Sequence, residues 1–341
     1  MPVTLKDIAK EVGFSVTTVS RALNDYDDVR EETKRKIRQV AQEMGYYPNV
    51  TAQRLQKRRT DTVGFIIPTF GPRFSDPFFS ELLAGIGNEA AKHEFDLLVS
   101  TRAPGPEELS AYQRKVKGKR VDGLLVVRTR CDDERITYLV KNRFPFVAYG
   151  RSDLPLDFPY LDVDGRQGLE QVTQHLIDLG HQRIAHITAP SNLMFTVYRD
   201  QGYRAALERN GIPLDERLIV VSDLTERGGF EAARALLGHD PPPTAIIADN
   251  DLMALGAISV AQKLGMVVGQ GISITGFDDI PIAAHSHPPL TTVRQPIYDI
   301  GRRICRMLIQ VIKGEELAER HILLQPELVV RESSGLFDLR M

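Results

Sequence analysis

Cysteine is scarce in this sequence, and long apolar runs are missing from it. The 341 residues include two cysteines, Cys131 and Cys305, which are too few for a disulfide framework or a cysteine-rich metal cluster. Charged residues crowd the segment 6–11, where a secretory signal would need an apolar stretch, and no run is long enough to cross a bilayer. We therefore expect a cytoplasmic protein with no membrane partner, no metal and no other cofactor.

Charge is unevenly distributed along the chain. Residues 1–60 carry 12 Lys and Arg against 8 Asp and Glu, whereas the remaining residues carry 31 against 37. A chain of this length suits two or three domains. A small basic head on a mildly acidic body indicates a polyanion-binding module joined to a second function.

Three short helices are expected in the head. Thr4, followed by Asp7, has the pattern of a helix N-cap, and the apolar stripe that follows ends at Gly13, a residue suited to ending a helix. Ser15 has the pattern of a second N-cap, and a third helix is expected from about 31 to 44. A tight turn containing glycine between two short helices is typical of a helix-turn-helix module.

The second helix presents a small polar face to its surroundings. Its spacing places Val19, Ala22 and Leu23 inside and leaves Val16, Thr17, Ser20 and Arg21 outside. Short side chains allow close approach to base edges in a major groove, and an arginine can bind guanine or a phosphate. The alternative is a three-helix bundle used for protein contacts, in which the arginine is only solvated.

The segment after the head, "YYPNVTAQRLQKRRTDT", indicates a further short helix. Pro48 and Asn49 form a helix-start signal, and the basic run 57–59 follows within a few turns. So short a helix is not stable alone in water. We expect it to fold only on a partner.

The two segments "TLKDIAKEVGFSVTTVSRALND" and "VREETKRKIRQVAQEMGYYPN" resemble the lactose/galactose repressor family, and the resemblance extends over the whole chain. It implies a repressor that binds palindromic double-stranded DNA as a homodimer, under the control of a small-molecule effector. The resemblance assigns base contacts to Val16, Thr17 and Arg21 and phosphate contacts to Ser15, Thr18 and Ser20. Thr4 and Asn24 are added to the expected DNA-contacting set.

The same resemblance places a hinge helix at 49–54, which includes Asn49. It makes Leu55, with Ala52 beside it, a wedge in the minor groove at the operator centre, where such wedges bend the duplex. The alternative for Leu55 is ordinary packing between domains. No leucine heptads follow the last apolar strand, so a dimer is expected rather than a tetramer.

The body reads as two doubly wound α/β lobes with parallel sheets. Short apolar runs such as "TVGFIIP" and "GLLVV", and a second series that includes "RIAHIT" and "TAIIA", alternate with amphipathic stretches. The resemblance implies a periplasmic-binding-protein-like pair of lobes joined by three crossings. The expected domains are a helix-turn-helix head (1–46), a hinge and linker (47–60), and a core (61–341). Within the core, the first lobe covers about 61–160 and 294–322, and the second covers about 161–293 and 323–341.

An effector site is expected between the lobes, because ligands of such sheets bind beyond the carboxyl ends of the strands. Polar and aromatic residues just past strand ends are the candidates, and carboxylates, amides and guanidinium groups beside aromatic rings suit a sugar. Two of them have ordinary alternatives, since Phe79 suits the core and Asp76 suits a helix cap. The expected effector-binding residues are Asp76, Phe78, Phe79, Arg151, Phe195, Arg199, Asn250 and Asp278.

Two features of the sequence bear on the identity of the effector. Leu193 and Phe195 stand where purine-responsive relatives carry polar residues, which favours a saccharide over a nucleobase. The segment "SDPFFSELLAG" resembles regulators of α-glucoside or related oligosaccharide use.

Two motifs and one protein class compete with this interpretation. "GIGNEA" (85–90) matches a loose dinucleotide-binding pattern but lies inside an expected helix, and "HSH" (285–287) has no third metal ligand near it. No nucleophile, base and acid set is apparent, so we expect no enzyme. The main functional alternative is a periplasmic-type sugar-binding module without regulatory DNA binding.

Overall fold

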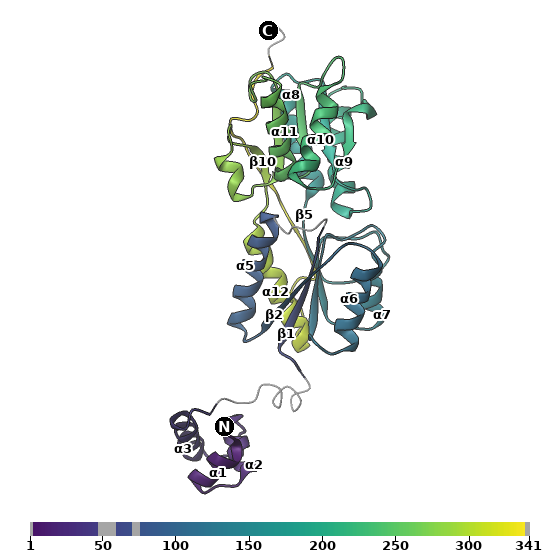
Figure 1. Ribbon diagram of the computed structural model, residues 1–341. Helices are drawn as coiled ribbons and strands as arrows, with labels where there is room; N and C mark the ends of the chain where they lie inside the picture. The colour runs from purple at the N-terminus through teal and green to yellow at the C-terminus, as the bar shows by residue number, and fades with distance from the viewer. Residues whose placement is uncertain (1–2, 47–58, 70–75, 338–341) are drawn as a thin grey trace. The chain divides into compact units, whose positions relative to one another are not determined.

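The computed structural model describes residues 3–46, 59–69 and 76–337. The chain separates into two compact units, Met1–Arg59 and Thr60–Met341. The first unit is a small helical head, and the second contains two sheet-based lobes (Figure 1). None of the helices in the described ranges is long and apolar enough to cross a membrane.

The head consists of α1 (Leu5–Val12), α2 (Val16–Leu23) and α3 (Glu31–Glu43). α1 begins after Thr4, whose backbone N–H and hydroxyl both donate to the Asp7 carboxylate, at 2.9 and 2.7 Å. It ends at Gly13, where φ is 75°, a left-handed value that glycine adopts without strain. Apolar residues from all three helices form the core: Ile8, Ala9, Val12, Val19, Ala22, Ile37 and Ala41.

The first lobe is built on a parallel six-stranded sheet in the order β11-β5-β4-β3-β1-β2. α5 (Pro77–Lys92) and α12 (Ile297–Lys313) cover one face, and α6 (Pro106–Lys117) and α7 (Glu134–Lys141) cover the other (Figure 1). Both faces are thus covered, and β1 and β3 are buried along their whole length. The strands are β1 (Thr62–Pro68), β2 (Asp96–Arg102), β3 (Gly123–Val127), β4 (Phe146–Tyr149), β5 (Tyr160–Val163) and β11 (His321–Leu324).

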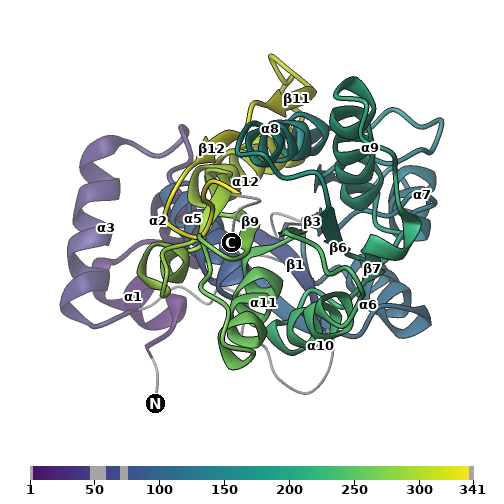
Figure 2. The same ribbon diagram turned by 90° about the horizontal axis from the view of Figure 1, so that it is seen from above.

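The second lobe repeats this architecture in the order β12-β10-β9-β8-β6-β7, with β12 antiparallel to β10 and the other pairs parallel. Viewed from above, α8 (Gly165–Asp178) and α9 (Met194–Arg209) lie on one side of the strands, and α10 (Glu226–Leu237) and α11 (Asp251–Lys263) on the other (Figure 2). The strands are β6 (Ile184–Thr188), β7 (Ile219–Val221), β8 (Ala245–Ala248), β9 (Ser273–Asp278), β10 (Thr291–Arg294) and β12 (Glu327–Val329), and two short 3-10 helices are η1 (Glu216–Leu218) and η2 (Pro281–His285).

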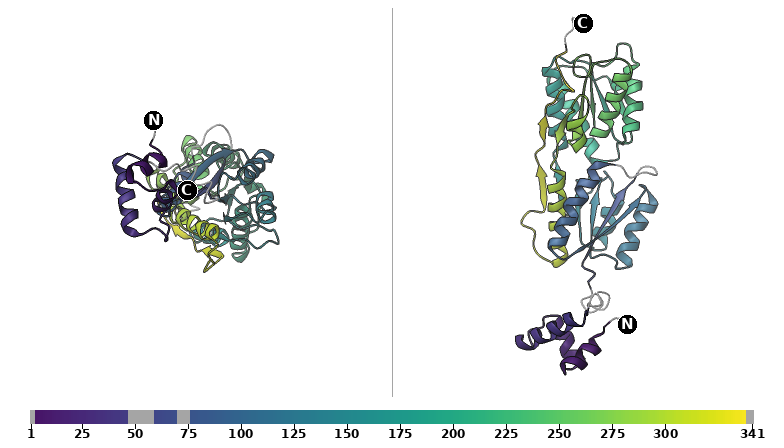
Figure 3. Two further views of the ribbon diagram at one scale, coloured as in Figure 1. Left: turned by 90° about the horizontal axis from the view of Figure 1, so that it is seen from below. Right: turned by 60° about the vertical axis from the view of Figure 1, so that its left-hand side comes forward.

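The chain crosses between the lobes three times, after β5, after β10 and after β11. β5 and β11 belong to the first sheet up to Val163 and Leu324, so two crossings come a little later than the expected boundaries at 160 and 322. The final segment 321–333 does not form one continuous strand. It forms β11 in one sheet and β12 in the other, because Pro326 has no N–H with which to continue a ladder. Figure 3 shows this segment passing from one lobe to the other.

Candidate functional site

The outer face of α2 is available for contact with a partner. Val16 is 41% exposed, and Thr17 and Arg21 are exposed beside it, whereas Val19 and Ala22 on the opposite face are buried. The Arg21 guanidinium lies 2.9 Å from the Asp28 carboxylate and over the ring of Tyr26. An ion pair this exposed contributes little free energy. A phosphate or a guanine can therefore displace it.

The other residues of the head that are expected to contact DNA lie on α2 and at the ends of α1 and α2. Ser15 caps the helix by accepting the Thr18 backbone N–H at 3.0 Å. The Asn24 amide donates to the backbone oxygen of Ser20 at 2.8 Å. Thr4 caps α1 through Asp7, as described above. These contacts fix the helix ends and leave the exposed hydroxyls at the surface of the head.

The expected hinge residues Asn49, Ala52 and Leu55 lie outside the described residues. Their assignment to a hinge helix and a minor-groove wedge stays a prediction.

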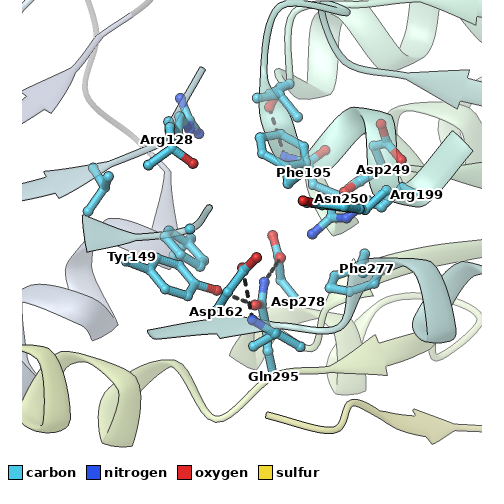
Figure 4. Close-up of a pocket in the computed structure, with 18 of the residues that line it drawn as sticks. Arg128, Tyr149, Asp162, Phe195, Arg199, Asp249, Asn250, Phe277, Asp278 and Gln295 are labelled. Carbon is cyan, nitrogen blue, oxygen red and sulfur yellow. Dashed lines mark hydrogen bonds between the residues drawn. The ribbon is translucent and has the colours of Figure 1, made fainter. Parts of the chain in front are cut away.

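A cavity lies between the two lobes of the second unit, at the carboxyl ends of both sheets (Figure 4). It holds about 720 Å³ of space free of protein atoms, including solvent at its mouth. Its walls come from the ends of β3, β4, β5 and β9, from the starts of α5, α9 and α11, and from the crossing after β10. The lining side chains expected from the sequence are Asp76, Phe78, Phe195, Arg199, Asn250 and Asp278.

Asp76 lies at the first-lobe wall of the cavity and has two roles. Its carboxylate caps α5 by accepting the Phe78 N–H at 3.1 Å, and it also accepts a hydrogen bond from Arg128 at 2.8 Å. Burial raises the pKa of Asp76, although the positive charge of Arg128 opposes this shift. Asp76 is therefore both a helix cap and a residue of the cavity lining.

Asp278 lies at the end of β9, on the second-lobe wall. Burial raises its pKa from 3.8 to about 7, against the lowering effect of Arg199. Its carboxylate accepts a hydrogen bond from the Gln295 amide, and the Gln295 oxygen accepts one from Tyr149. A hydrogen-bonded chain thus runs from β9 through the crossing to β4 in the other lobe (Figure 4).

Arg199 projects from α9 into the cavity between two aromatic rings. Its guanidinium carbon lies 3.6 Å from the ring centroid of Phe277 and 4.6 Å from that of Phe195. One N–H donates to the backbone oxygen of Asp249, and the Nε group is buried without a hydrogen-bond partner among the described residues. A buried donor without an acceptor is costly, so an oxygen-rich ligand is favoured here.

Asn250 lines the cavity but directs its polar atoms along the chain. Its oxygen accepts the Met253 N–H at 3.0 Å, which caps α11, and its amide donates to the Leu224 oxygen at 3.0 Å. One amide hydrogen remains for a ligand, since an amide nitrogen has two.

Two of the expected effector residues are not part of the cavity lining. Phe79 is buried in the core of the first lobe and packs under Arg128, with 4.7 Å from the guanidinium carbon to the ring centroid, so its side chain is held by the core. Arg151 binds Asp162 at 2.7 Å and lies 3.7 Å from the ring centroid of Tyr198 on α9. Arg151 therefore connects the lobes beside the cavity.

Sequence reasoning missed several polar or aromatic residues that line the cavity: Arg128, Thr129, Tyr149, Asp162, Tyr198, Asp249, Phe277 and Gln295. Arg128 directly follows the apolar run 123–127, so the rule of looking past strand ends would have found it. Asp162 lies in β5, a strand that was not expected. Gln295 lies in a crossing, where no periodic pattern marks a residue.

The two competing motifs have structural explanations. A Cβ at Gly85 would lie 2.1 Å from the Tyr298 oxygen, so this glycine allows α5 and α12 to approach each other closely. It lies within α5 and not at a strand-to-helix turn, where a dinucleotide phosphate would bind. The "HSH" segment covers the end of η2 and the loop after it, and within the described ranges no group of three potential ligands can hold a metal ion.

Sequence profiles of two kinds match this chain. The profile of bacterial regulatory proteins of the lacI family covers residues 4–49, and that of periplasmic binding proteins and the sugar binding domain of the LacI family covers residues 60–332. The chain belongs to the LacI family. It is a DNA-binding transcriptional regulator with a sugar-binding domain, and it is not an enzyme.

Similar LacI-family proteins cover nearly the whole chain. The HTH-type transcriptional regulator AglR of Rhizobium meliloti (strain 1021) is 36% identical over 339 residues, which are 98% of this chain and 95% of AglR. The HTH-type transcriptional regulator CelR of Thermobifida fusca is 36% identical over 338 residues, 97% of this chain and 98% of CelR.

Two solved structures extend this similarity to the fold. A complex of the transcriptional regulator CelR with cellobiose has a TM-score of 0.75 at 34% identity and covers 97% of this chain and 99% of that one. The lac repressor dimer bound to operator and the anti-inducer ONPF has a TM-score of 0.86 at 28% identity and covers 98% of this chain and 100% of that one.

Proposed function

We propose that this LacI-family regulator binds a palindromic operator as a homodimer in the cytoplasm and releases it when a neutral glucose disaccharide binds between the lobes. The dimer is supported by the lac repressor structure, which is a dimer on its operator. Two short reading helices related by a twofold axis match two half-sites of a palindrome.

The composition of the cavity supports a neutral ligand rich in hydroxyl groups. Burial raises the pKa of three lining carboxylates, Asp76, Asp162 and Asp278, and this effect outweighs the donors that each already has. Further donors from a ligand would stabilise their charged forms. Arg128 and Arg199 offset much of this negative charge. Sugar hydroxyls both donate to carboxylates and accept from guanidinium groups.

The aromatic side chains support a ring-shaped ligand. Phe78 and Tyr149 stack on the first-lobe side, with their ring centroids 6.1 Å apart and an interplanar angle of 17°. Phe195 and Phe277 lie on the second-lobe side. The apolar face of a pyranose packs on such rings. CelR has been solved with cellobiose, which makes a glucose disaccharide the first choice.

A single observation carries this proposal: polar groups of both lobes converge on one cavity. A ligand that contacts Asp76 of one lobe and Asp278 of the other stabilises the closed arrangement of the lobes. Such differential contact shifts a two-state equilibrium. We expect operator affinity to fall by roughly ten- to a hundredfold.

The test combines a thermal-shift screen with a gel shift. Cellobiose, maltose and trehalose are compared with hypoxanthine, because a bound ligand raises the unfolding midpoint by mass action. The best sugar is then added to protein bound to its operator. Stabilisation by hypoxanthine and by none of the sugars would refute the proposed ligand class, and unchanged operator binding would refute the switch.

The DNA contacts of the head and hinge are part of the same proposal. Val16, Thr17 and Arg21 contact bases, Ser15, Thr18 and Ser20 contact phosphates, and Leu55 enters the minor groove. Leu55→Ala is expected to weaken specific binding and bending while leaving salt-dependent non-specific binding nearly unchanged. An equal loss on specific and random duplexes would contradict the wedge.

A further inference from the structure

Residues 128–131, here called the strap, extend from β3 of the first lobe and pair with the second lobe. The backbone N–H of Met194 donates to the Thr129 oxygen at 2.9 Å, and the N–H of Cys131 donates to the Asn192 oxygen at 3.0 Å. The residues between these two bonds form an antiparallel bridge. Backbone of one lobe is thus hydrogen-bonded directly to backbone of the other.

The strap also forms part of the effector cavity. Arg128 binds Asp76 at 2.8 Å, and Thr129 lines the cavity next to it. On the other side, the strap meets the start of α9, the helix that carries Phe195 and Arg199. Its shape therefore affects the cavity wall and the contact between lobes at the same time.

Beneath the strap lies a buried ionic cluster, formed by Glu108, Asp133 and Arg135. All three side chains are at most 1% exposed. Arg135 binds Glu108 at 2.7 Å and Asp133 at 2.7 and 2.9 Å, and it also donates to the backbone oxygen of Arg128 at 3.0 Å. Asp133 accepts the backbone N–H of Arg130 at 3.0 Å. One side chain of the cluster holds a carbonyl of the strap, and another holds an amide.

The strap has an unusual backbone conformation at the point where the cluster holds it. Arg128 has a φ of 47°, a left-handed value that residues other than glycine rarely adopt. Such a conformation persists only where surrounding contacts impose it. The hydrogen bonds from Arg135 and to Asp133, on either side of Thr129, supply those contacts.

A buried ion cluster is not needed for stability alone. Well-packed apolar residues of similar volume are often as stabilising as a buried ion pair. What apolar residues cannot do is donate to a strap carbonyl and accept from a strap amide. We therefore explain the cluster by the position in which it holds the strap backbone.

We propose that Arg135 is a positioning residue that, with Glu108 and Asp133, holds the strap in the conformation that pairs with the second lobe. This proposal rests on the proposed function, since it makes the cluster part of the effector response. With the strap fixed, occupation of the cavity and pairing of the lobes occur together. With the strap loose, a ligand binds without drawing the second lobe to the first.

Hydrogen exchange of the ligand-free, full-length protein tests the strap itself. Arg135→Lys keeps the positive charge but cannot reach two carboxylates and a carbonyl at once. We expect the Cys131 and Met194 amides to exchange at least about tenfold faster in this variant than in the wild type. Leu139→Ala, in the buried face of the same helix, is the matched control for general destabilisation. In this control we expect the ratio between the exchange rates of the Cys131 and Met194 amides and those of the β3 amides to stay as in the wild type. Equal exchange of both amides in wild type and Arg135→Lys would overturn the proposal.

A gel shift with cellobiose tests the coupling. We expect Arg135→Lys to reduce the cellobiose-dependent loss of operator affinity severalfold, while Leu139→Ala keeps the wild-type ratio. A full response in Arg135→Lys would overturn the coupling. A wild type that binds its operator and ignores cellobiose would instead contradict the proposed effector, and the exchange measurement, which needs no ligand, would still decide the role of Arg135.

Discussion

The guanidinium carbon of Arg199 lies 3.6 Å from the ring centroid of Phe277, and the two side chains form one wall of the cavity between the lobes. The close approach of the ring restrains the guanidinium, while its Nε group stays without a partner among the described residues. An arginine held in this way presents donors at fixed positions to a ligand. Phe277 thus helps to orient the effector indirectly, because it positions the arginine that donates to the ligand.

Replacement of Arg199 by methionine should weaken effector binding. The variant fills similar space but loses charged donors, which are each worth about 1.5–3 kcal/mol, or roughly ten- to a hundredfold in affinity. Arg199→Lys should recover little of the affinity, because an ammonium group neither stacks on an aromatic ring nor forms two parallel hydrogen bonds. Isothermal titration with the best sugar measures the effect. Arg209→Met, exposed on the same helix, is the control, and a loss of equal size there would contradict the assignment.

The ionisation of Asp278 should make the effector-free protein less stable as pH rises. Its pKa is about 7 when folded and near 3.8 when unfolded, so the folded state binds the extra proton between these values. The free energy of unfolding therefore falls from about pH 4 to about pH 7. Asp278→Asn should remove this slope and increase stability at pH 8 by up to about 4 kcal/mol, since the two pKa values differ by about three units and each unit corresponds to about 1.4 kcal/mol.

Urea unfolding at pH 5 and pH 8 measures this difference. Glu208→Gln, an exposed change on α9, is the control and should leave the slope of the wild type in place. If Asp278→Asn and the wild type lose the same stability between the two pH values, another group is responsible.

Two glycines of α5 should respond in opposite directions to alanine. A Cβ at Gly85 would meet the backbone oxygen of Tyr298 at 2.1 Å, so Gly85→Ala should destabilise the protein by about 1–3 kcal/mol. Gly87 has no atom within 4 Å of such a Cβ, so Gly87→Ala should stabilise the helix by up to about 1 kcal/mol. Thermal unfolding of both variants is the test. A stabilised Gly85→Ala would contradict the prediction and show that α12 can move away from α5 at little cost.

Two residues of the head should have opposite effects on operator binding. Arg21→Ala should cost about 1–3 kcal/mol and relax the preference at one base position if the arginine binds a guanine. Asp28→Asn should tighten binding a fewfold, because it removes both the partner that competes for Arg21 and a negative charge near the DNA-facing helix. Fluorescence anisotropy at several salt concentrations compares both with the wild type. Weaker binding by Asp28→Asn would mean that the ion pair orients Arg21 for the DNA.

The sequence predicted the secondary structure of the head and the main strands because their signals are local. Thr4, Ser15 and Gly13 mark helix ends through their own side chains or backbone freedom. Apolar runs such as 62–68 and 123–127 mark strands that are buried on both faces. These signals depend on neighbours a few residues away.

The missing parts of the prediction depend on contacts between distant segments. β5 is four residues long, and its pairing with β11 joins residues far apart in the chain. Gln295 becomes a pocket residue only because Tyr149 and Asp278 meet it from two lobes. Arg151 lies just past the end of a strand, as the sequence rule requires. Its contacts with Asp162 and Tyr198 nevertheless place its side chain beside the cavity and not in its lining. No local pattern contains this information.

The threefold passage of the chain between the lobes has a consequence for recombination of these genes. A single junction in the linker near residue 60 exchanges the whole DNA-binding head, so a new operator preference is one crossover away. Neither lobe is encoded by one uninterrupted stretch, because β11 and α12 return to the first lobe after the second has been built. Chimaeras that trade one lobe would need several matched junctions. The DNA-binding head is therefore the part of this regulator that recombination can exchange most easily. The two lobes that form the effector site are inherited together.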